Sequence, residues 1–115
     1  MTAKPVVPRE KAQRDIEEAI DHYVREAGVE VALGFVDALE AAYVRLSAHP
    51  ASGSPRYAYE LGIAELRSTR IRRFPHLIFY VDLPGKVDVW RVLHGKGDIP
   101  AWLLESGASD MPDKN

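Results

Sequence analysis

The stretch ELRSTRIRRFPHLIFYV, residues 65–81, decides how this chain folds. Residues 64–72 alternate between apolar and polar and predict a strand, and the β-branched and aromatic run His76–Val81 predicts another. The intervening Arg73–Pro75 predicts a turn, because proline has no N–H to donate inside a sheet. The arginines and the histidine of this hairpin could form the edge of an active site, a surface for an acidic partner, or only a hairpin corner.

Two helices are predicted before this hairpin. Apolar residues recur at helical spacing over Pro8–Ala27 and again over Val29–Ala48, with only Gly28 between the two segments. Pro8 suits the first turn of the first helix, where Glu10 lies favourably near the positive end of the helix dipole. So short a connection predicts an antiparallel helical hairpin whose apolar stripes face one core.

A loop and a turn are predicted on either side of the two hairpin strands. His49–Gly62 is rich in proline, glycine and serine, which predicts a surface connection. We expect Tyr57, Tyr59 and Leu61 to attach this connection to the body of the protein. Asp82–Lys86 contains Pro-Gly and predicts a tight turn.

The two ends of the chain contribute smaller elements. Val87–His94 predicts a third strand, and Val6 and Val7 could add an edge strand. Asp98 is expected to cap a short C-terminal helix. The predicted fold class is therefore α+β, with an N-terminal antiparallel helical hairpin packed on a small antiparallel β-sheet of three to four strands.

Length and composition limit the class of protein. A chain of 115 residues suits one domain, which we place over residues 1–105, with residues 106–115 as a disordered, acidic tail. Apolar residues make up 46% and charged residues 28%, which is ordinary for a soluble globular protein. The sequence shows neither a span of ~20 apolar residues nor the apolar region of a signal peptide, so we expect a cytoplasmic location.

Charge is divided unevenly along the chain. Residues 9–46 carry nine acidic and five basic residues, whereas residues 64–96 carry seven basic and three acidic ones. The basic half could face an acidic partner, or the two halves could neutralise each other within the fold. The sequence leaves these two interpretations about equal.

The sequence lacks the usual signatures of enzymatic chemistry. It has no cysteine, which excludes thiolate metal sites and cysteine nucleophiles, and no histidines at metal-binding spacing, so neither a metal nor a cofactor is expected. Acid–base cleavage of RNA without a metal would need a base, a cation and an acid, which histidine, arginine and tyrosine can supply. A structural role is nevertheless favoured for each histidine: His22, His49, His76 and His94.

The order of the segments resembles a known family. After the helical hairpin, HPASGSPR (49–56), ELRSTRIRRFPHLIFYV (65–81) and VDVWRVLHGKGDIP (87–100) resemble the ParE branch of the RelE/ParE toxin superfamily. These are small toxins of type II toxin–antitoxin modules, and the resemblance covers nearly the whole chain. RelE-like members cleave mRNA in the ribosomal A site, whereas ParE-like members poison DNA gyrase and block replication.

The positions that RelE-type nucleases use distinguish the two activities. Those nucleases carry an arginine where this chain has His76, a second arginine where it has Gly97, and a tyrosine near the segment Ala101–Leu103. Of these residues only His76 could act in catalysis. The resemblance therefore implies a gyrase inhibitor that is not an enzyme. A RelE-like endonuclease and a degenerate toxin that only binds its antitoxin remain the alternatives.

The resemblance also implies two partners. The target surface is expected in the basic strands and the segment after them, at Arg67, Arg73, Arg91, His94, Lys96 and Trp102. The alternative for Arg91 and His94 is that they hold the last strand to the helices. Strand alternation would place Arg70 and Arg72 opposite Arg67 and Arg73, so that the four could not line one site.

The second partner would be a ParD-like antitoxin, which also makes the only contact with DNA. Its C-terminal segment would fold on the toxin, placing an amphipathic helix in an apolar groove and acidic groups on the basic patch. The expected contacts are Tyr43, Leu46, Tyr57, Tyr59, Arg70 and Arg72.

Overall fold

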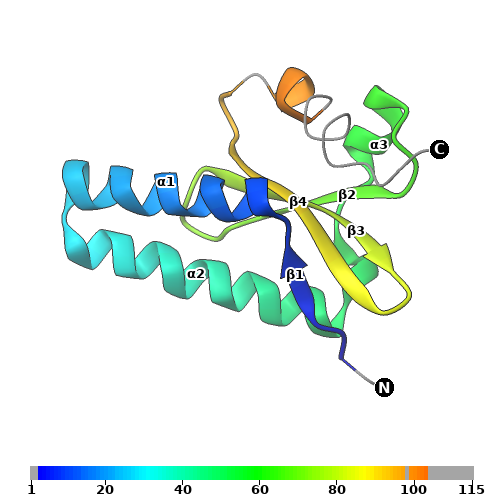
Figure 1. Cartoon of the computed structure of the whole chain (residues 1–115), viewed down its shortest axis with the longest axis horizontal. Helices are drawn as coiled ribbons and strands as arrows, with labels where there is room; N and C mark the ends of the chain where they lie inside the picture. The colour runs from blue at the N-terminus through cyan, green and yellow to red at the C-terminus, as the bar shows by residue number, and fades with distance from the viewer. Residues whose placement is uncertain (1–2, 98, 104–115) are drawn as a thin grey trace.

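The computed structural model of the chain describes residues 3–97 and 99–103 (Figure 1). Residues 99–103 are helical, which confirms the short C-terminal helix, while Asp98 and residues 106–115 lie outside the described part. None of the described helices has the length and apolar character that crossing a bilayer requires. The elements are, in chain order, β1 (Val6–Pro8), α1 (Glu10–Ala27), α2 (Val29–Ala48), η1 (Pro50–Ser52), α3 (Arg56–Leu61), β2 (Leu66–Arg70), β3 (His76–Leu83) and β4 (Lys86–His94).

The sheet has four strands in the order β1-β4-β3-β2. β2, β3 and β4 form the predicted antiparallel meander. The predicted edge strand at Val6 and Val7 is confirmed, but it pairs parallel to β4, so the sheet is mixed rather than antiparallel. The Arg9 N–H still donates to the Val89 carbonyl at 2.9 Å. Because β1 runs parallel to β4, α1 begins beside Val89 and continues along the second half of β4.

Pro8 lies at the end of β1 and not, as predicted, in the first turn of α1. Arg9 is the N-cap residue, and the helix begins at Glu10, which occupies the first turn as expected. An edge strand tolerates proline because one of its two sides has no ladder to maintain.

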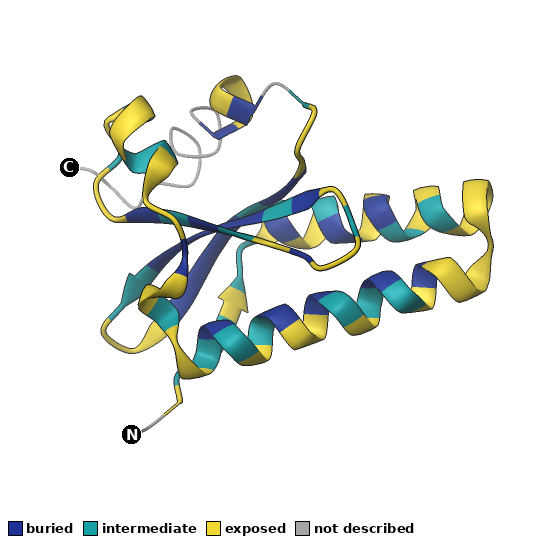
Figure 2. Cartoon of the chain, turned by 180° about the vertical axis from the view of Figure 1, so that it is seen from behind, coloured by how far each residue is buried: buried dark blue, intermediate teal, exposed yellow. Residues whose placement is uncertain are grey.

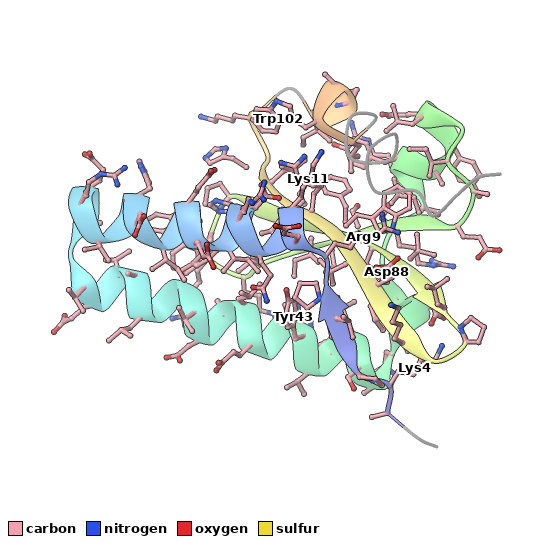
Figure 3. The ribbon with its side chains drawn as sticks, viewed as in Figure 1. Lys4, Arg9, Lys11, Tyr43, Asp88 and Trp102 are labelled. Atoms are coloured by element: carbon pink, nitrogen blue, oxygen red, sulfur yellow. The ribbon has the colours of Figure 1, made fainter. Side chains whose placement is uncertain are left out.

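Two ion pairs fasten β1 to the hairpin of β3 and β4 (Figure 3). Lys4 pairs with Asp82, and the Arg9 guanidinium makes two hydrogen bonds to the Asp88 carboxylate, at 2.9 and 3.1 Å. The Trp90 indole N–H donates to the same carboxylate at 3.2 Å, and the Arg9 guanidinium lies 4.7 Å from the Trp90 ring centroid. These acids therefore hold a three-residue strand that has little surface of its own to bury.

The helical hairpin is confirmed and covers one face of the sheet (Figure 2). Gly28 joins α1 to α2 with a φ of 97°, a left-handed conformation that glycine adopts without a steric penalty. The predicted apolar stripes supply most of the buried helical side chains, which pack on β3, β4 and the β2–β3 turn. This first core contains Ala12, Ile16, Ala19, Phe35, Leu39, Ala42, Leu46, Ile71, Ile78, Tyr80, Val87, Val89 and Val92.

The opposite face of the sheet is covered by α3 and the C-terminal helix. The segment predicted as a loop therefore contains a helix, α3, which ends at Gly62 in the left-handed conformation. Helical spacing places Tyr57 and Leu61 against this second core, as expected, but leaves Tyr59 82% exposed. The buried members of the second core are Leu66, Phe79, Val81, Trp90, Leu93, Ile99 and Leu103.

Candidate functional site

Half of the predicted contact residues line two surface depressions. The first, here called the histidine cleft, lies between α1 and the end of β4. It is lined by Asp15, Glu18, Ala19, His22, Tyr23, His76, Arg91, Val92, Leu93, His94 and Trp102. The second, the arginine groove, follows the outer edge of β2. It is lined by Arg45, Ser52, Gly53, Ser54, Ser68, Thr69, Arg70, Arg72 and Arg73.

His76 lies at the bottom of the histidine cleft and is only 8% exposed. It pairs across the sheet with His94, with ring centroids 5.3 Å apart. Burial, together with the nearby His94 and His22, lowers the pKa of His76 to about 4. Its Nδ1 atom is buried and has no hydrogen-bond partner among the described residues. His76 is therefore a neutral imidazole at physiological pH.

Arg91 closes one side of the cleft through a partly buried ion pair with Asp15. Its Nε and Nη2 atoms donate to the two Asp15 carboxylate oxygens at 2.7 and 2.8 Å, and the Val92 N–H donates to the same carboxylate at 3.0 Å. Its Nη1 atom donates to the Trp102 carbonyl at 3.2 Å. β1 pairs with β4 only at Val87–Val89, so the backbone of β4 beyond Val89 has no strand beside it on this edge. Asp15 accepts the hydrogen bond from the Val92 N–H there. Arg91 joins α1, β4 and the C-terminal helix.

A register shift in the β3–β4 pair positions Arg91 for this contact. The shift lies between Phe79, which pairs with Arg91, and Tyr80, which pairs with Val89, so that Trp90 is the extra residue. Bulges of this kind redirect the side chains that follow them. The sequence alternation alone does not reveal it, because both faces of β4 are apolar.

The outer rim of the cleft consists of His94 and the segment after it. The Lys96 N–H donates to His94 Nδ1 at 3.1 Å, so the proton of a neutral His94 sits on Nε2, which can donate to a partner. His94 and Lys96 are exposed, and Trp102 is 38% exposed. Figure 3 labels Trp102 near the C-terminal helix. The Trp102 ring lies over Gly97, where an added Cβ would come within 2.3 Å of the ring.

The arginine groove collects residues that strand alternation was expected to separate. β2 ends at Arg70, two residues earlier than predicted, and Arg73 adopts a positive φ of 73°. The alternation of side chains therefore stops before the turn, and Arg70, Arg72 and Arg73 line the same groove. The prediction that Arg73 faces away from Arg70 and Arg72 was wrong for this reason. Arg45, on α2, completes the set.

Other predicted contact residues lie outside the two depressions. Arg67 is half-buried and donates to the Gly53 carbonyl at 2.8 Å. Leu46 is 1% exposed and belongs to the first core. Burial raises the pKa of Tyr43 to about 12, and its hydroxyl has no partner among the described residues. Tyr59 is the exposed member of this set.

The three positions that the resemblance relates to the charged and phenolic groups of RelE-type nucleases lie close together at the histidine cleft. His76 and Trp102 line it, and Gly97 lies beneath the Trp102 ring. A general base works best with a pKa near the operating pH and with access to its substrate. His76 has neither property, and glycine offers no cation. Within the described residues, no group of three or more potential ligands is placed to bind a metal ion.

A comparison with protein families gives the identity of this scaffold. The family model of the ParE toxin of the type II toxin–antitoxin system, parDE, matches residues 6–99. The chain belongs to the ParE toxin family. The match includes both long helices and all four strands, and it ends within the C-terminal helix.

The fold of this ParE family member is also found among solved structures. A chain of the chromosomal ParDE TA system from P. aeruginosa is similar, with a TM-score of 0.66 and 21% sequence identity. The match covers 80% of the present chain and 96% of that chain. At this identity the likeness shows the fold alone. No curated protein gives a significant match.

Two residues of this ParE scaffold were missed by the sequence analysis. Asp15 lies three residues after Ala12 and four before Ala19, and both alanines are buried. Helical spacing therefore places its carboxylate beside the buried stripe of α1, and this position could have identified Asp15 from the sequence. Arg45 gave no such signal, because an arginine in the last turn of a helix commonly interacts with the helix dipole.

Proposed function

We propose that this chain is the toxin of a type II toxin–antitoxin module. It acts in the cytoplasm by inhibiting DNA gyrase, and so DNA replication, and a ParD-like antitoxin neutralises it by direct binding. Membership of the ParE family supports the module. One observation supports inhibition by binding rather than by cleavage: the Trp102 ring lies over Gly97. At the place where a nuclease would need a cation, this chain has an aromatic surface.

The proposed target surface is the rim of the histidine cleft. His94, Lys96 and Trp102 are accessible there and offer a hydrogen-bond donor, a positive charge and an aromatic ring. Aromatic side chains in such positions commonly anchor protein interfaces. Arg91 supports this rim from below through Asp15, so we assign it a positioning role. Arg67 lies on β2 and Arg73 in the turn after it, and neither is part of the rim.

The proposed antitoxin surface includes the exposed Tyr59 and the arginine groove. Arg70 and Arg72 are both exposed and line that groove. Leu46 and Tyr43 are packed in the first core and offer little to a partner, and Tyr57 is packed in the second. An acidic antitoxin segment would be attracted to the groove, which speeds association.

The experiment is a supercoiling assay with purified gyrase and relaxed plasmid. The toxin is expected to inhibit supercoiling and to promote linear, cleaved DNA. Trp102→Ala removes the aromatic anchor and is expected to weaken inhibition by about tenfold, the effect of a typical interface hot spot. Tyr59→Ala, on the other surface, is the matched aromatic control and should leave inhibition unchanged.

The assay also separates the alternatives. No effect on gyrase at a stoichiometric excess of toxin would refute the proposed target. Cuts in translated mRNA during growth arrest, lost in His76→Gln, would instead support ribosome-dependent cleavage. Expression without the antitoxin and without any growth defect would leave a degenerate toxin that only binds its partner.

A further inference from the structure

The arginine groove concentrates positive charge from three parts of the chain. Arg45 lies on α2, Arg70 ends β2, and Arg72 and Arg73 belong to the turn before β3. Among the described residues, none of these four arginines forms an ion pair, and no acidic side chain lines the groove. The groove therefore attracts an anion, and guanidinium groups match the oxygens of a phosphate especially well.

The backbone at the groove offers a hydrogen-bond donor and not an acceptor. Ser54 and Ser68 exchange two backbone hydrogen bonds, at 2.8 and 2.9 Å. Antiparallel alternation turns the N–H and the carbonyl of Arg70, two residues further on, toward the same side. The Arg45 guanidinium already donates to this carbonyl at 3.2 Å, which leaves the N–H for a ligand. A ligand that brings only acceptors suits such an edge.

The rest of the lining is small or polar. Among the described residues, no aromatic or apolar side chain lines the groove. Sites for single-stranded nucleic acid usually stack bases on aromatic rings, and an amphipathic peptide needs an apolar surface. Hydroxyl groups, guanidinium groups and backbone N–H groups are instead the usual contacts to phosphate oxygens of duplex DNA. The remaining lining residues are Ser52, Gly53, Ser54, Ser68 and Thr69.

The groove adjoins the rim of the histidine cleft at the β2–β3 turn. Pro75 follows Arg73 by two residues, and its carbonyl accepts a hydrogen bond from the Gly95 N–H at 2.7 Å. Gly95 lies between His94 and Lys96, which belong to the rim. A partner bound at the rim therefore brings whatever it carries close to the arginines.

We propose that the arginine groove binds the phosphate backbone of duplex DNA without reading its sequence. The guanidinium groups contact phosphates, and the Arg70 N–H donates to a phosphate oxygen. This departs from the expectation that only the antitoxin contacts DNA. The biological setting rests on the proposed function: the DNA is the segment held by a gyrase molecule bound at the rim. Because the groove is also part of the proposed antitoxin surface, antitoxin and DNA would compete for it.

The test measures binding of the toxin to a fluorescein-labelled duplex of about 20 base pairs by fluorescence anisotropy, at salt concentrations from about 50 to 200 mM. If each arginine neutralises one phosphate, the logarithm of the binding constant should fall with the logarithm of the salt concentration with a slope of about −3 to −4. Arg70→Gln with Arg72→Gln should bring the slope closer to zero by about two and weaken binding by about tenfold.

A matched pair of variants controls for net charge. Arg14→Gln with Arg25→Gln, on α1, removes the same charge and should leave the slope unchanged and the affinity within about twofold. Arg45→Gln is an independent variant on a different element of the groove and should reduce the slope by about one. Circular dichroism first confirms that all the variants fold.

Four results of this assay would overturn the proposal. Two are the absence of duplex binding at the lowest salt concentration and an equal loss of affinity in the α1 control pair. The third is displacement of the duplex by tripolyphosphate as effectively as by unlabelled duplex at equal phosphate concentration, which would indicate a site for small anions. The fourth is tighter binding of an oligothymidylate than of the duplex, which would indicate a site for single strands.

A second arm keeps the proposal separate from the proposed function. In the supercoiling assay, Arg70→Gln with Arg72→Gln should require about tenfold more toxin than wild type for the same inhibition. Inhibition equal to that of wild type, despite the lost duplex affinity, would overturn the contact with gyrase-held DNA and leave the proposed function standing. No inhibition by wild-type toxin would count against the proposed function, while the anisotropy assay would still decide whether the groove binds duplex DNA.

Discussion

The clearest quantitative prediction concerns His76 and acid. The imidazole is 8% exposed and packs edge-on against Phe35, with ring centroids 5.1 Å apart, and against His94 at 5.3 Å. Tyr23 contacts it from α1, and His22 and Asp15 are the other groups of α1 whose charge it senses. Protonation would place a charge in this largely apolar setting.

The size of the effect follows from the two pKa values. The unfolded chain takes up a proton at His76 below the ordinary pKa of 6.5, whereas the folded protein does so only below about 4. Between these values the unfolded state binds more protons, so the free energy of unfolding falls as the pH falls. His76 alone should remove about 2 kcal/mol between pH 7 and pH 5, and about 3 kcal/mol in all once the pH is below 4.

The assay is urea unfolding at pH 7 and pH 5, followed by tryptophan fluorescence. Wild type and His76→Gln are compared, because glutamine keeps a polar group but does not titrate. The variant should lose about 2 kcal/mol less than wild type over this interval. His49→Gln, at an exposed histidine, is the control and should behave as wild type. An equal loss in wild type and His76→Gln would refute the reasoning.

Three further predictions test contacts that hold the scaffold. Asp15→Asn leaves the half-buried Arg91 without its counter-charge and should lower the free energy of unfolding by about 3 kcal/mol, measured by urea denaturation. Tyr80→Phe removes a hydroxyl with two hydrogen-bond partners in the loop before α3 and should cost about 2 kcal/mol in the same assay; a cost near zero would contradict it. Gly97→Ala should displace the Trp102 ring and red-shift its fluorescence, and an unchanged spectrum would show that the ring does not rest there.

Local patterns predicted the elements, because the information that forms them is local. Helical spacing identified α1 and α2 nearly to the residue, and Gly28 marked their join. β3 and β4 were recognisable as β-branched and aromatic runs. The helix α3 was missed because proline, glycine and serine dominate the segment around it, while its own six residues are too few to show a helical period.

Long-range pairings could not be predicted in the same way. Asp15 and Arg91 are 76 residues apart in sequence, and Arg9 and Asp88 are 79 apart. Asp15–Arg91 joins the acidic half of the chain to the basic half, which is the internal neutralisation that the charge layout allowed, whereas Arg9–Asp88 joins the minority charges of the two halves. That neutralisation is partial: among the described residues, the four arginines of the groove form no ion pair.

The sequence RRFPH at residues 72–76 contributes to both the arginine groove and the histidine cleft. It can do so because its arginines and its aromatic and histidine side chains point in different directions. The Phe74 ring contacts Tyr23 and Phe35, each with a centroid distance of 5.3 Å, and this fixes the turn to the helices. Arg72 and Arg73 are thereby left outside, where they line the groove, and His76 begins the strand that forms the floor of the cleft. A regular strand would alternate these side chains between the faces of the sheet. The turn at Arg73, with its positive φ, replaces that alternation with a division, in which the two arginines line the groove and the buried His76 lies in the cleft.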